Sequence, residues 1–212
     1  MARGIFVVLE GPEGAGKTTL ASSLAARIRE AGVDLVTVRE PGGTPVAEAL
    51  RAELLNGNRA FTAEAELLYM VTARADLVTR VIRPALEAGK TVLSDRYDLS
   101  TMAYQGAGRG LPREQVRWVN AAATGGLTAD LTLVLDLDPA VGRERQRGAG
   151  KGADRLERED VEFHGRVAAE YLAARGAGVH HLRADASPER VLAQAWAQLV
   201  ALRPETFCPR AE

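Results

Sequence analysis

The chain has 212 residues, of which 27 are basic, 28 are acidic and 46% are hydrophobic, and its formal net charge is −1. This length suits one domain, and this balance is typical of a soluble globular protein. A disulfide framework and a four-cysteine zinc site are excluded, because Cys208 is the single cysteine. A duplex nucleic-acid-binding protein is disfavoured, because such domains are usually strongly basic. No apolar run approaches the roughly 18 residues of a membrane span, so we expect a cytoplasmic protein that binds neither nucleic acid nor membrane.

Short apolar runs alternate with longer stretches of helical periodicity, which predicts βαβ units and a parallel sheet. The apolar runs predict strands at residues 5–9, 33–38, 91–94, 131–136 and 179–182. The periodic stretches predict helices at residues 17–31, 63–88, 139–147 and 187–202. Pro84 is expected to end or kink the second of these helices, because proline cannot continue the hydrogen-bond ladder.

A phosphate-binding loop follows the first predicted strand and opens the first predicted helix. Residues 11–18 match the pattern G-x-x-x-x-G-K-[ST] in this context, which indicates a nucleoside triphosphate site. Glycines let successive backbone N–H groups point into one concavity, and the helix N-terminus adds partial positive charge. We expect Lys17 to reach the β- and γ-phosphates of ATP and the Thr18 hydroxyl to ligate Mg²⁺. The loop residues predicted to bind ATP are Gly11, Pro12, Glu13, Gly14, Ala15, Gly16, Lys17, Thr18 and Thr19.

These features together predict an α/β fold of the P-loop NTPase type, in which helices flank a five-stranded parallel sheet in three layers. One domain is expected over residues 1–202. A loose tail is expected over residues 203–212, because they contain two prolines and no periodicity. A glycine-rich basic segment at 147–153 cannot hold a helix and predicts a mobile segment.

The phosphate loop alone leaves the reaction open, because ATPases, GTPases and small-molecule kinases all carry it. An Asn-Lys-x-Asp string, expected in a GTPase, does not occur in the sequence. Two further motifs follow strands, where ligands collect in an open α/β sheet. They are Arg-Glu-Pro-Gly-Gly at 39–43, after the second strand, and Asp-Arg-Tyr at 95–97, after the third. Met70 and Arg74 lie four residues apart on one face of the helix between them.

With the phosphate loop, these motifs resemble those of the bacterial thymidylate kinases, P-loop nucleoside monophosphate kinases that phosphorylate dTMP to dTDP with ATP. The resemblance covers about residues 5–202 and extends to Ser-Thr-Met-Ala-Tyr-Gln-Gly at 100–106 and Asp-Arg-Leu-Glu at 154–157. It implies an ATP- and Mg²⁺-dependent enzyme of dTTP biosynthesis that forms a homodimer through its helices. Two alternatives stay open. The chain could be another nucleoside monophosphate or deoxynucleoside kinase or, more remotely, an ATP-dependent switch without an acceptor.

The resemblance also implies a role for individual residues on the acceptor side. Arg96, helped by Arg51, would hold the dTMP phosphate, and arginine suits this because its planar fork grips phosphate oxygens in pairs. Arg74 and Gln105 would bind the base, while Met70 stands where the family usually has a phenylalanine stacked on thymine. The full set of implied dTMP-binding residues is Glu13, Glu40, Pro41, Arg51, Met70, Arg74, Arg96, Thr101, Tyr104 and Gln105.

On the donor side, the resemblance implies a lid over about residues 143–158 that carries catalytic cations. In the family, an arginine at the position of Arg145 packs against adenine. Phosphoryl transfer depends mainly on alignment and charge neutralisation. The residues expected to be catalytic are therefore cationic: Lys17, Arg96, Arg147, Lys151 and Arg155. Asp95 is the preferred partner of Thr18 in holding Mg²⁺, with Glu10 as a weaker candidate.

Overall fold

The computed structural model describes residues 3–56, 59–148 and 154–208, with side chains omitted at 146–148. It has one sheet of five parallel strands in the order β2-β3-β1-β4-β5. The strands are β1 (Phe6–Glu10), β2 (Leu35–Arg39), β3 (Thr91–Asp95), β4 (Leu131–Asp136) and β5 (Val179–Arg183). All five predicted strands are therefore confirmed, with ends shifted by one or two residues at β1, β2, β3 and β5.

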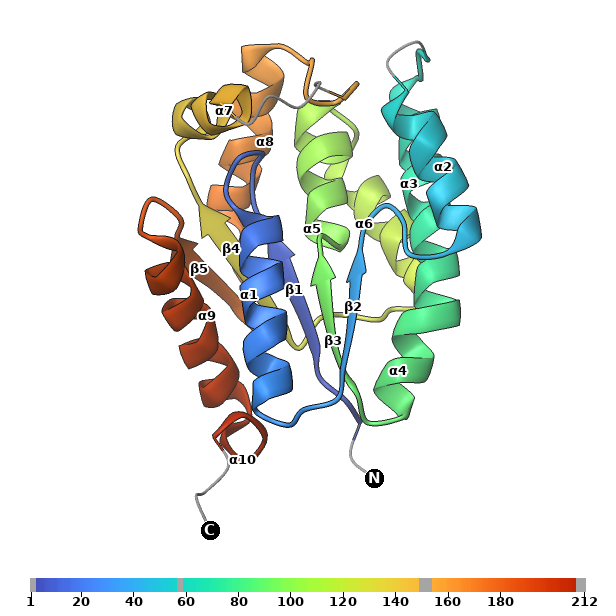
Figure 1. Cartoon of the computed structure of the whole chain (residues 1–212). Coiled ribbons are helices and arrows are strands. Elements are labelled where there is room, and N and C mark those ends of the chain that lie inside the picture. Colours follow the sequence, from blue (N-terminus) through green and yellow to red (C-terminus); the bar gives the residue numbers. More distant parts are fainter. Residues whose placement is uncertain (1–2, 57–58, 149–153, 209–212) are drawn as a thin grey trace.

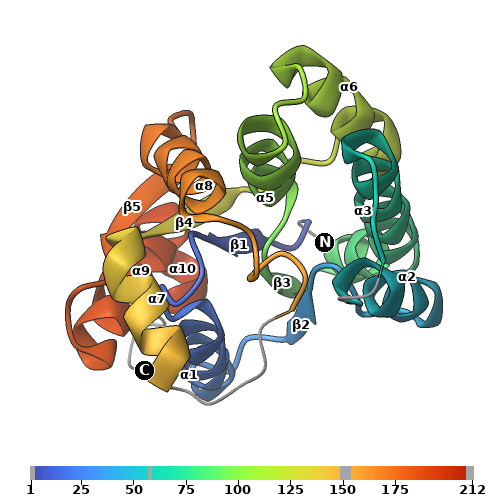
Figure 2. The same cartoon turned by 90° about the horizontal axis from the view of Figure 1, so that it is seen from above.

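Helices cover both faces of the sheet, as Figures 1 and 2 show. One face carries α1 (Lys17–Glu30) and α9 (Pro188–Leu202), followed by α10 (Pro204–Phe207). The other helical elements are α2 (Pro45–Leu55), α3 (Ala63–Leu77), η1 (Val78–Ile82), α4 (Arg83–Glu87), α5 (Asp98–Thr101), η2 (Met102–Gly108), α6 (Arg113–Thr124), α7 (Pro139–Gly148) and α8 (Val161–Ala173). The predicted three-layer α/β fold is confirmed.

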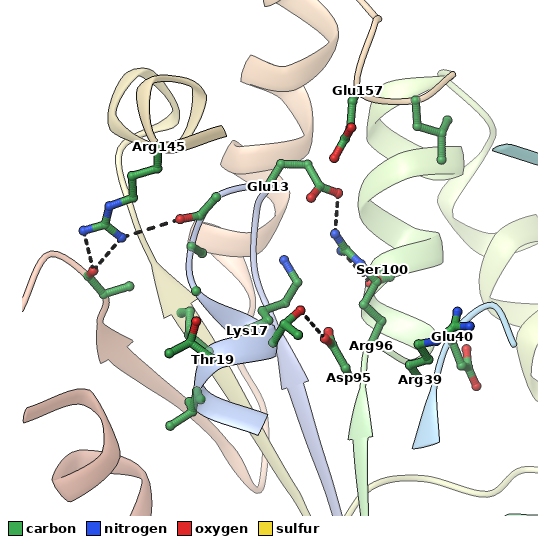
Figure 3. Close-up of a pocket in the computed structure, with 18 of the residues that line it drawn as sticks. Glu13, Lys17, Thr19, Arg39, Glu40, Asp95, Arg96, Ser100, Arg145 and Glu157 are labelled. Carbon is green, nitrogen blue, oxygen red and sulfur yellow. Dashed lines mark hydrogen bonds and ion pairs between the residues drawn. The ribbon is translucent and has the colours of Figure 1, made fainter. Parts of the chain in front are cut away.

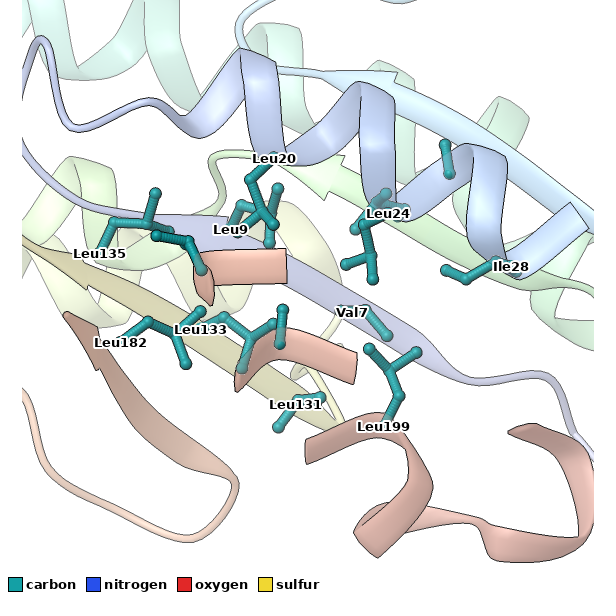
Figure 4. Close-up of a cluster of buried hydrophobic side chains, with 14 of the residues drawn as sticks. Val7, Leu9, Leu20, Leu24, Ile28, Leu131, Leu133, Leu135, Leu182 and Leu199 are labelled. Carbon is teal, nitrogen blue, oxygen red and sulfur yellow. The ribbon is translucent and has the colours of Figure 1, made fainter. Parts of the chain in front are cut away.

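The periodicity of α1 explains how this helix is held on the sheet. Leu20, Leu24 and Ile28 recur every four residues, so they share one face of the helix. That face packs on Val7 and Leu9 of β1, and all five side chains are at most 3% exposed (Figure 4). Burial of such a cluster is the main stabilising term for the layer. It also fixes the start of α1 against the carboxyl end of β1.

The long helix predicted over 63–88 is interrupted where proline requires it. A regular helix, α3, ends at Leu77, a π-helical stretch follows as η1, and Pro84 then lies in the first turn of α4. Proline has no amide hydrogen to donate, so the ladder of the preceding turn cannot continue unchanged through it. A π-helical turn next to such a break is a common form of the adjustment.

Up to residue 208, the C-terminal segment differs from the loose tail predicted for 203–212, because it packs on the core. Phe207 is 2% exposed and belongs to the same core cluster as α1 and α9. Its ring lies 5.8 Å from that of Trp196, edge to face. A single aromatic residue between prolines produces no periodicity, which is why the sequence pattern missed it. No helix within the described ranges is long and apolar enough to span a bilayer.

Candidate active site

A cavity of about 770 Å³ opens at the carboxyl ends of β1, β2 and β3. Its walls come from the phosphate loop and the start of α1, from the ends of β2, β3 and β4 and the segments after β2 and β3, and from side chains of α2, α3, α5, η2 and α7. The stretches 154–157 and 184–191 complete them. Figure 3 shows the side chains that converge there from these elements. The cavity therefore lies at the edge of the sheet where ligands collect in α/β proteins.

The phosphate loop keeps its glycines for steric reasons. Gly14 has φ +73°, and a Cβ added there would lie 2.2 Å from the carbonyl oxygen of Gly142 in α7. A Cβ on Gly142 would in turn lie 2.4 Å from the carbonyl oxygen of Glu13. Gly16, at φ +91°, precedes α1, whose first turn has no side-chain cap. The free N–H groups of that turn suit an anion.

Lys17 is held inside the loop. Its Nζ donates to the carbonyl oxygens of Gly11 and Pro12, both at 2.8 Å, and the residue is 7% exposed. Burial, with the nearby charge of Arg96, lowers the pKa of Lys17 to about 8. A phosphate group placed in the loop would reverse this shift, because its negative charge favours the ammonium form.

Thr18 and Asp95 meet at the foot of the cavity. The Thr18 hydroxyl donates to Oδ2 of Asp95 at 3.1 Å, and the buried Oδ1 of Asp95 has no hydrogen-bond partner. A hydroxyl and a carboxylate are hard oxygen donors of the kind that Mg²⁺ takes beside phosphate oxygens and waters. The described residues contain no cluster of three or more acidic, histidine or cysteine side chains. The residues present thus fit a metal held partly by substrate.

Arg96 faces the phosphate loop from the end of β3. Its backbone has φ 79°, which is uncommon for a residue other than glycine and often marks a functional position. Nη2 pairs with the Glu13 carboxylate and lies 3.3 Å from the Tyr104 hydroxyl. Burial opposes the ionisation of Glu13, but the charges of Arg96 and Lys17 outweigh it and lower the pKa of Glu13 to about 2.

Glu40, Pro41, Arg51 and Met70, which were predicted to bind the acceptor, also line the cavity. Nη1 of Arg51 donates to the carbonyl oxygen of Pro41 at 2.8 Å. Arg39, which the sequence analysis did not assign, also lines the cavity and pairs with Glu48 at 3.0 Å. These residues were brought together as the motif order predicted.

Arg74 does not reach the cavity in this structure. It is 1% exposed, and its Nε donates to Oε2 of Glu40 at 2.6 Å. Its Nη1 donates to Thr101 and Asn120, and its Nη2 donates to the carbonyl oxygen of Tyr97. These contacts engage four of the five N–H donors of the guanidinium, and Nη2 also lies 2.6 Å from Oε2 of Glu40 in an ion pair. In this structure the long side chain turns toward the buried carboxylate of Glu40, and its contact with the base stays a prediction.

Thr101 and Gln105 also lie behind the cavity wall, each with 0% exposure. Nε2 of Gln105 donates to Oε1 of Glu66 at 2.8 Å. Its Oε1 is buried and has no hydrogen-bond partner. Both residues were predicted to complete the nucleoside pocket. They are one layer too deep for direct contact here, since η2 packs its inner face on α3 and α8.

The lid residues divide into two groups. Arg145 reaches the carbonyl oxygens of Gly14 at 3.5 Å and Ala184 at 3.2 Å, on the opposite side of the cavity from Arg39 and Glu40 (Figure 3). Arg155 turns away from the loop, because Glu66 accepts from its Nη2 at 2.7 Å and Leu54 from its Nε at 2.8 Å. The expectation that Arg155 faces the phosphates is therefore not met. The Arg147 side chain and Lys151 lie outside the described residues.

Glu10 is a buried acceptor and does not line the cavity as a metal ligand would. It is 0% exposed and accepts from the backbone amides of Tyr97 and Ser100. Burial, which outweighs the hydrogen bond from Ser100 and the charge of Arg96, raises the pKa of Glu10 to about 7. Sequence reasoning missed its neighbour Tyr171 entirely, because the tyrosine stands 75 residues from Arg96 and belongs to no motif.

Comparison with known proteins gives one consistent result. Residues 9–195 match the family model described as thymidylate kinase. A thymidylate kinase of Deinococcus radiodurans is 47% identical over 205 residues, which cover 97% of this chain and 92% of the relative. Thymidylate kinases of Thermomicrobium roseum and Cereibacter sphaeroides are 49% and 48% identical, covering 91% and 93% of this chain and 92% and 95% of the relatives. The chain therefore belongs to the thymidylate kinase family.

Proposed function

We propose that this chain transfers the γ-phosphoryl group of ATP to dTMP, forming ADP and dTDP. The observation that carries the proposal is the position of Arg96 opposite Lys17 in one cavity (Figure 3). Two cationic positions, one in the phosphate loop and one at the end of β3, suit a donor and an acceptor phosphate. An ATP-dependent switch without an acceptor needs only the first.

On the donor side, Lys17 and the free amides of the first turn of α1 would bind the β- and γ-phosphates. Arg145, held between Gly14 and Ala184, would cover the adenine. Thr18 and Asp95 would hold Mg²⁺, which when bound neutralises charge on the transferred group. Mg²⁺ is proposed here because the Thr18 hydroxyl and the Asp95 carboxylate are hard oxygen donors. In addition, Oδ1 of Asp95 has no hydrogen-bond partner among the described residues.

On the acceptor side, the dTMP phosphate would replace Glu13 as the partner of Arg96. The attacking phosphate oxygen is already ionised at neutral pH, so the reaction requires no strong general base. Alignment of the two phosphates supplies most of the rate. A lid cation would cover the equatorial oxygens of the moving group, and Arg147 and Lys151 stay the predicted residues for this role.

We further propose that the protein acts as a cytoplasmic homodimer in dTTP biosynthesis. Leu68 on α3 and Trp118 on α6 are 56% and 72% exposed, although both are large apolar side chains. These two helices pack together, so a second copy could cover both residues at once. Cys208 is a free thiol, which suits a reducing compartment. Sedimentation of the wild type and of Trp118→Ser would test the dimer, which predicts that the variant dissociates at higher concentration.

A coupled assay of ADP release tests the reaction. ATP and Mg²⁺ are supplied with dTMP, dUMP, dCMP, AMP or GMP in turn. The proposal predicts ADP release that depends on dTMP, with dUMP weaker. ADP release at the same rate without any acceptor would favour the switch. A preference for another monophosphate would keep the mechanism and overturn the specificity.

A further inference from the structure

A buried hydrogen-bonded cluster lies behind Arg96 and has no part in the mechanism given above. It consists of Glu10 on β1, Ser100 on α5 and Tyr171 on α8, and each residue is at most 1% exposed. The Ser100 hydroxyl donates to Oε2 of Glu10 at 2.6 Å. The Tyr171 hydroxyl lies 3.2 Å from the same oxygen and 2.9 Å from Oγ of Ser100. Three elements far apart in sequence therefore meet at one carboxylate.

The direction of these hydrogen bonds leaves two oxygens as acceptors for Arg96. The Ser100 proton is directed to Glu10, and the single Tyr171 proton is directed to Glu10 or to Ser100. Neither proton points at the arginine. Nη1 of Arg96 then donates to the Tyr171 oxygen at 3.1 Å and to the Ser100 oxygen at 3.3 Å.

The two ends of the Arg96 guanidinium thus have different surroundings. Nη1 faces the buried hydroxyls of Ser100 and Tyr171, of which Ser100 also lines the cavity and Tyr171 does not. Nη2 faces Glu13 and Tyr104, both of which line the cavity. A planar guanidinium fixed at one nitrogen presents the other in a defined direction. Without the anchor, the fork can turn both nitrogens toward Glu13, which competes with an incoming phosphate.

We propose that Tyr171 is a positioning residue for the acceptor phosphate: its hydroxyl holds Nη1 of Arg96 so that Nη2 points at the phosphate of the bound monophosphate. The identity of that monophosphate as dTMP rests on the proposed function. The geometry requires only that the acceptor carry a phosphate. Tyr171 does not touch substrate, so its effect must pass through Arg96.

The test compares two tyrosine-to-phenylalanine variants that each remove one buried hydroxyl. Tyr171→Phe removes the nearest of three oxygens that accept from Nη1 of Arg96, the other two being Oγ of Ser100 and the carbonyl oxygen of Gly11. Tyr97→Phe is the matched control, because the Tyr97 hydroxyl is bonded to the carbonyl oxygen of Leu127 at 2.9 Å, away from the cavity. Steady-state kinetics at pH 8 with ATP and dTMP varied separately, and urea unfolding, are measured for both.

Tyr171→Phe should raise KM for dTMP about tenfold, the size expected for one hydrogen bond to a charged group. KM for ATP should change less than twofold, and kcat should fall less than threefold. Tyr97→Phe should lose similar stability with less than twofold change in KM for dTMP. Equal increases of both KM values, or matching kinetics for the two variants, would overturn the proposal and leave Tyr171 a structural residue.

Ser100→Ala provides a second route if Tyr171→Phe does not fold, since the Ser100 hydroxyl is the other side-chain oxygen that accepts from Nη1 among the described residues. It should also raise KM for dTMP selectively, and an unchanged KM for dTMP would count against the anchor. Assays of the wild type distinguish a failure of this inference from a failure of the proposed function. If the wild type prefers another monophosphate, the same ratios are measured with that acceptor. If no monophosphate is phosphorylated, calorimetric binding of dTMP to the wild type and Tyr171→Phe replaces the kinetics.

Discussion

The carboxylate of Glu13 and the guanidinium of Arg96 form an ion pair across the cavity, with side chains that are 26% and 15% exposed. The pair joins the phosphate loop to the end of β3, which is the gap that the two phosphates must share. Before substrate binds, the loop supplies its own anion to the arginine. In the proposed reaction, binding of the acceptor would therefore exchange one anion for another, and its free energy would be smaller than that of a phosphate binding to an unpaired arginine.

Arg96→Ala is expected to lower kcat/KM for dTMP by about 10³-fold or more, because it removes the cation that aligns the acceptor phosphate. The measurement is the coupled assay with ATP saturating. Arg80→Ala is the control, since Arg80 is 66% exposed and pairs only with Asp76 four residues earlier among the ion pairs of the described chain. A loss of less than tenfold in Arg96→Ala would remove this residue from the acceptor site.

ATP binding is expected to take up a proton at Lys17. With a pKa of about 8, most of the ammonium is deprotonated at pH 8.5, and the triphosphate charge restores it. The uptake should reach up to about 0.7 proton, from the fraction that is neutral at that pH. Calorimetry in two buffers of different ionisation enthalpy measures it. Lys90→Met changes an exposed lysine and should take up as many protons as the wild type. If the wild type takes up no proton, the lowered pKa of Lys17 is contradicted.

Glu10 is expected to make the protein less stable as pH rises from about 4.5 to 7. Its folded pKa of about 7 lies above the unfolded value of 4.5, so the folded state holds the proton more tightly in this range. The stabilisation is complete below pH 4.5 and lost as pH rises through 7, by at most about 3 kcal/mol. Urea unfolding of the wild type and Glu10→Gln across this range should differ in slope. Parallel curves would show that Glu10 titrates normally.

Thr18→Val is expected to raise the Mg²⁺ concentration needed for half-maximal activity on the order of tenfold or more, because it removes a proposed metal ligand while keeping the shape of the side chain. Titration of activity with Mg²⁺ at fixed ATP measures the change. Ser22→Ala removes a hydroxyl one turn later on α1, where it donates to the Thr18 carbonyl oxygen. That variant should keep the wild-type requirement, and equal responses of the two would argue against Thr18 as a ligand.

Phe207→Ala is expected to lower the free energy of unfolding by about 3 kcal/mol, the usual cost of emptying a buried phenylalanine site. Both KM values should stay within twofold of the wild type. The cavity opens at the carboxyl ends of β1, β2 and β3, and α10 lies at the opposite end of the sheet (Figure 1). Thermal or urea unfolding measures the loss. A change below about 0.5 kcal/mol would indicate that α10 detaches freely in solution.

Local patterns predicted the parts of this protein that depend on local chemistry. The strand, loop and helix from Phe6 to Glu30 follow from apolar runs, glycine positions and a four-residue repeat, and each is confirmed. The resemblance to thymidylate kinases is confirmed by the comparisons. The roles assigned to single site residues stay predictions.

Long-range pairing limited the prediction of side-chain positions. Arg74 turns inward because it donates to Glu40 and Asn120. These partners lie 34 residues before it and 46 residues after it, and no spacing rule in the sequence connects the three. Arg155 forms an ion pair with Glu66, 89 residues away along the chain. A buried carboxylate binds whichever guanidinium the fold brings close, and that choice depends on packing between helices.

The contact between Gly14 and Gly142 has a consequence for engineering this enzyme. Neither glycine has room for a β-carbon: one on Gly14 would clash with the carbonyl oxygen of Gly142, and one on Gly142 would clash with the carbonyl oxygen of Glu13. The phosphate loop and α7 therefore touch through backbone atoms. A mutational library aimed at a new phosphoryl donor should therefore find both positions intolerant, singly and together. Arg145, one turn further along α7, would be free to vary. The nucleobase preference for the phosphoryl donor could then be changed while the phosphate-binding loop stays the same.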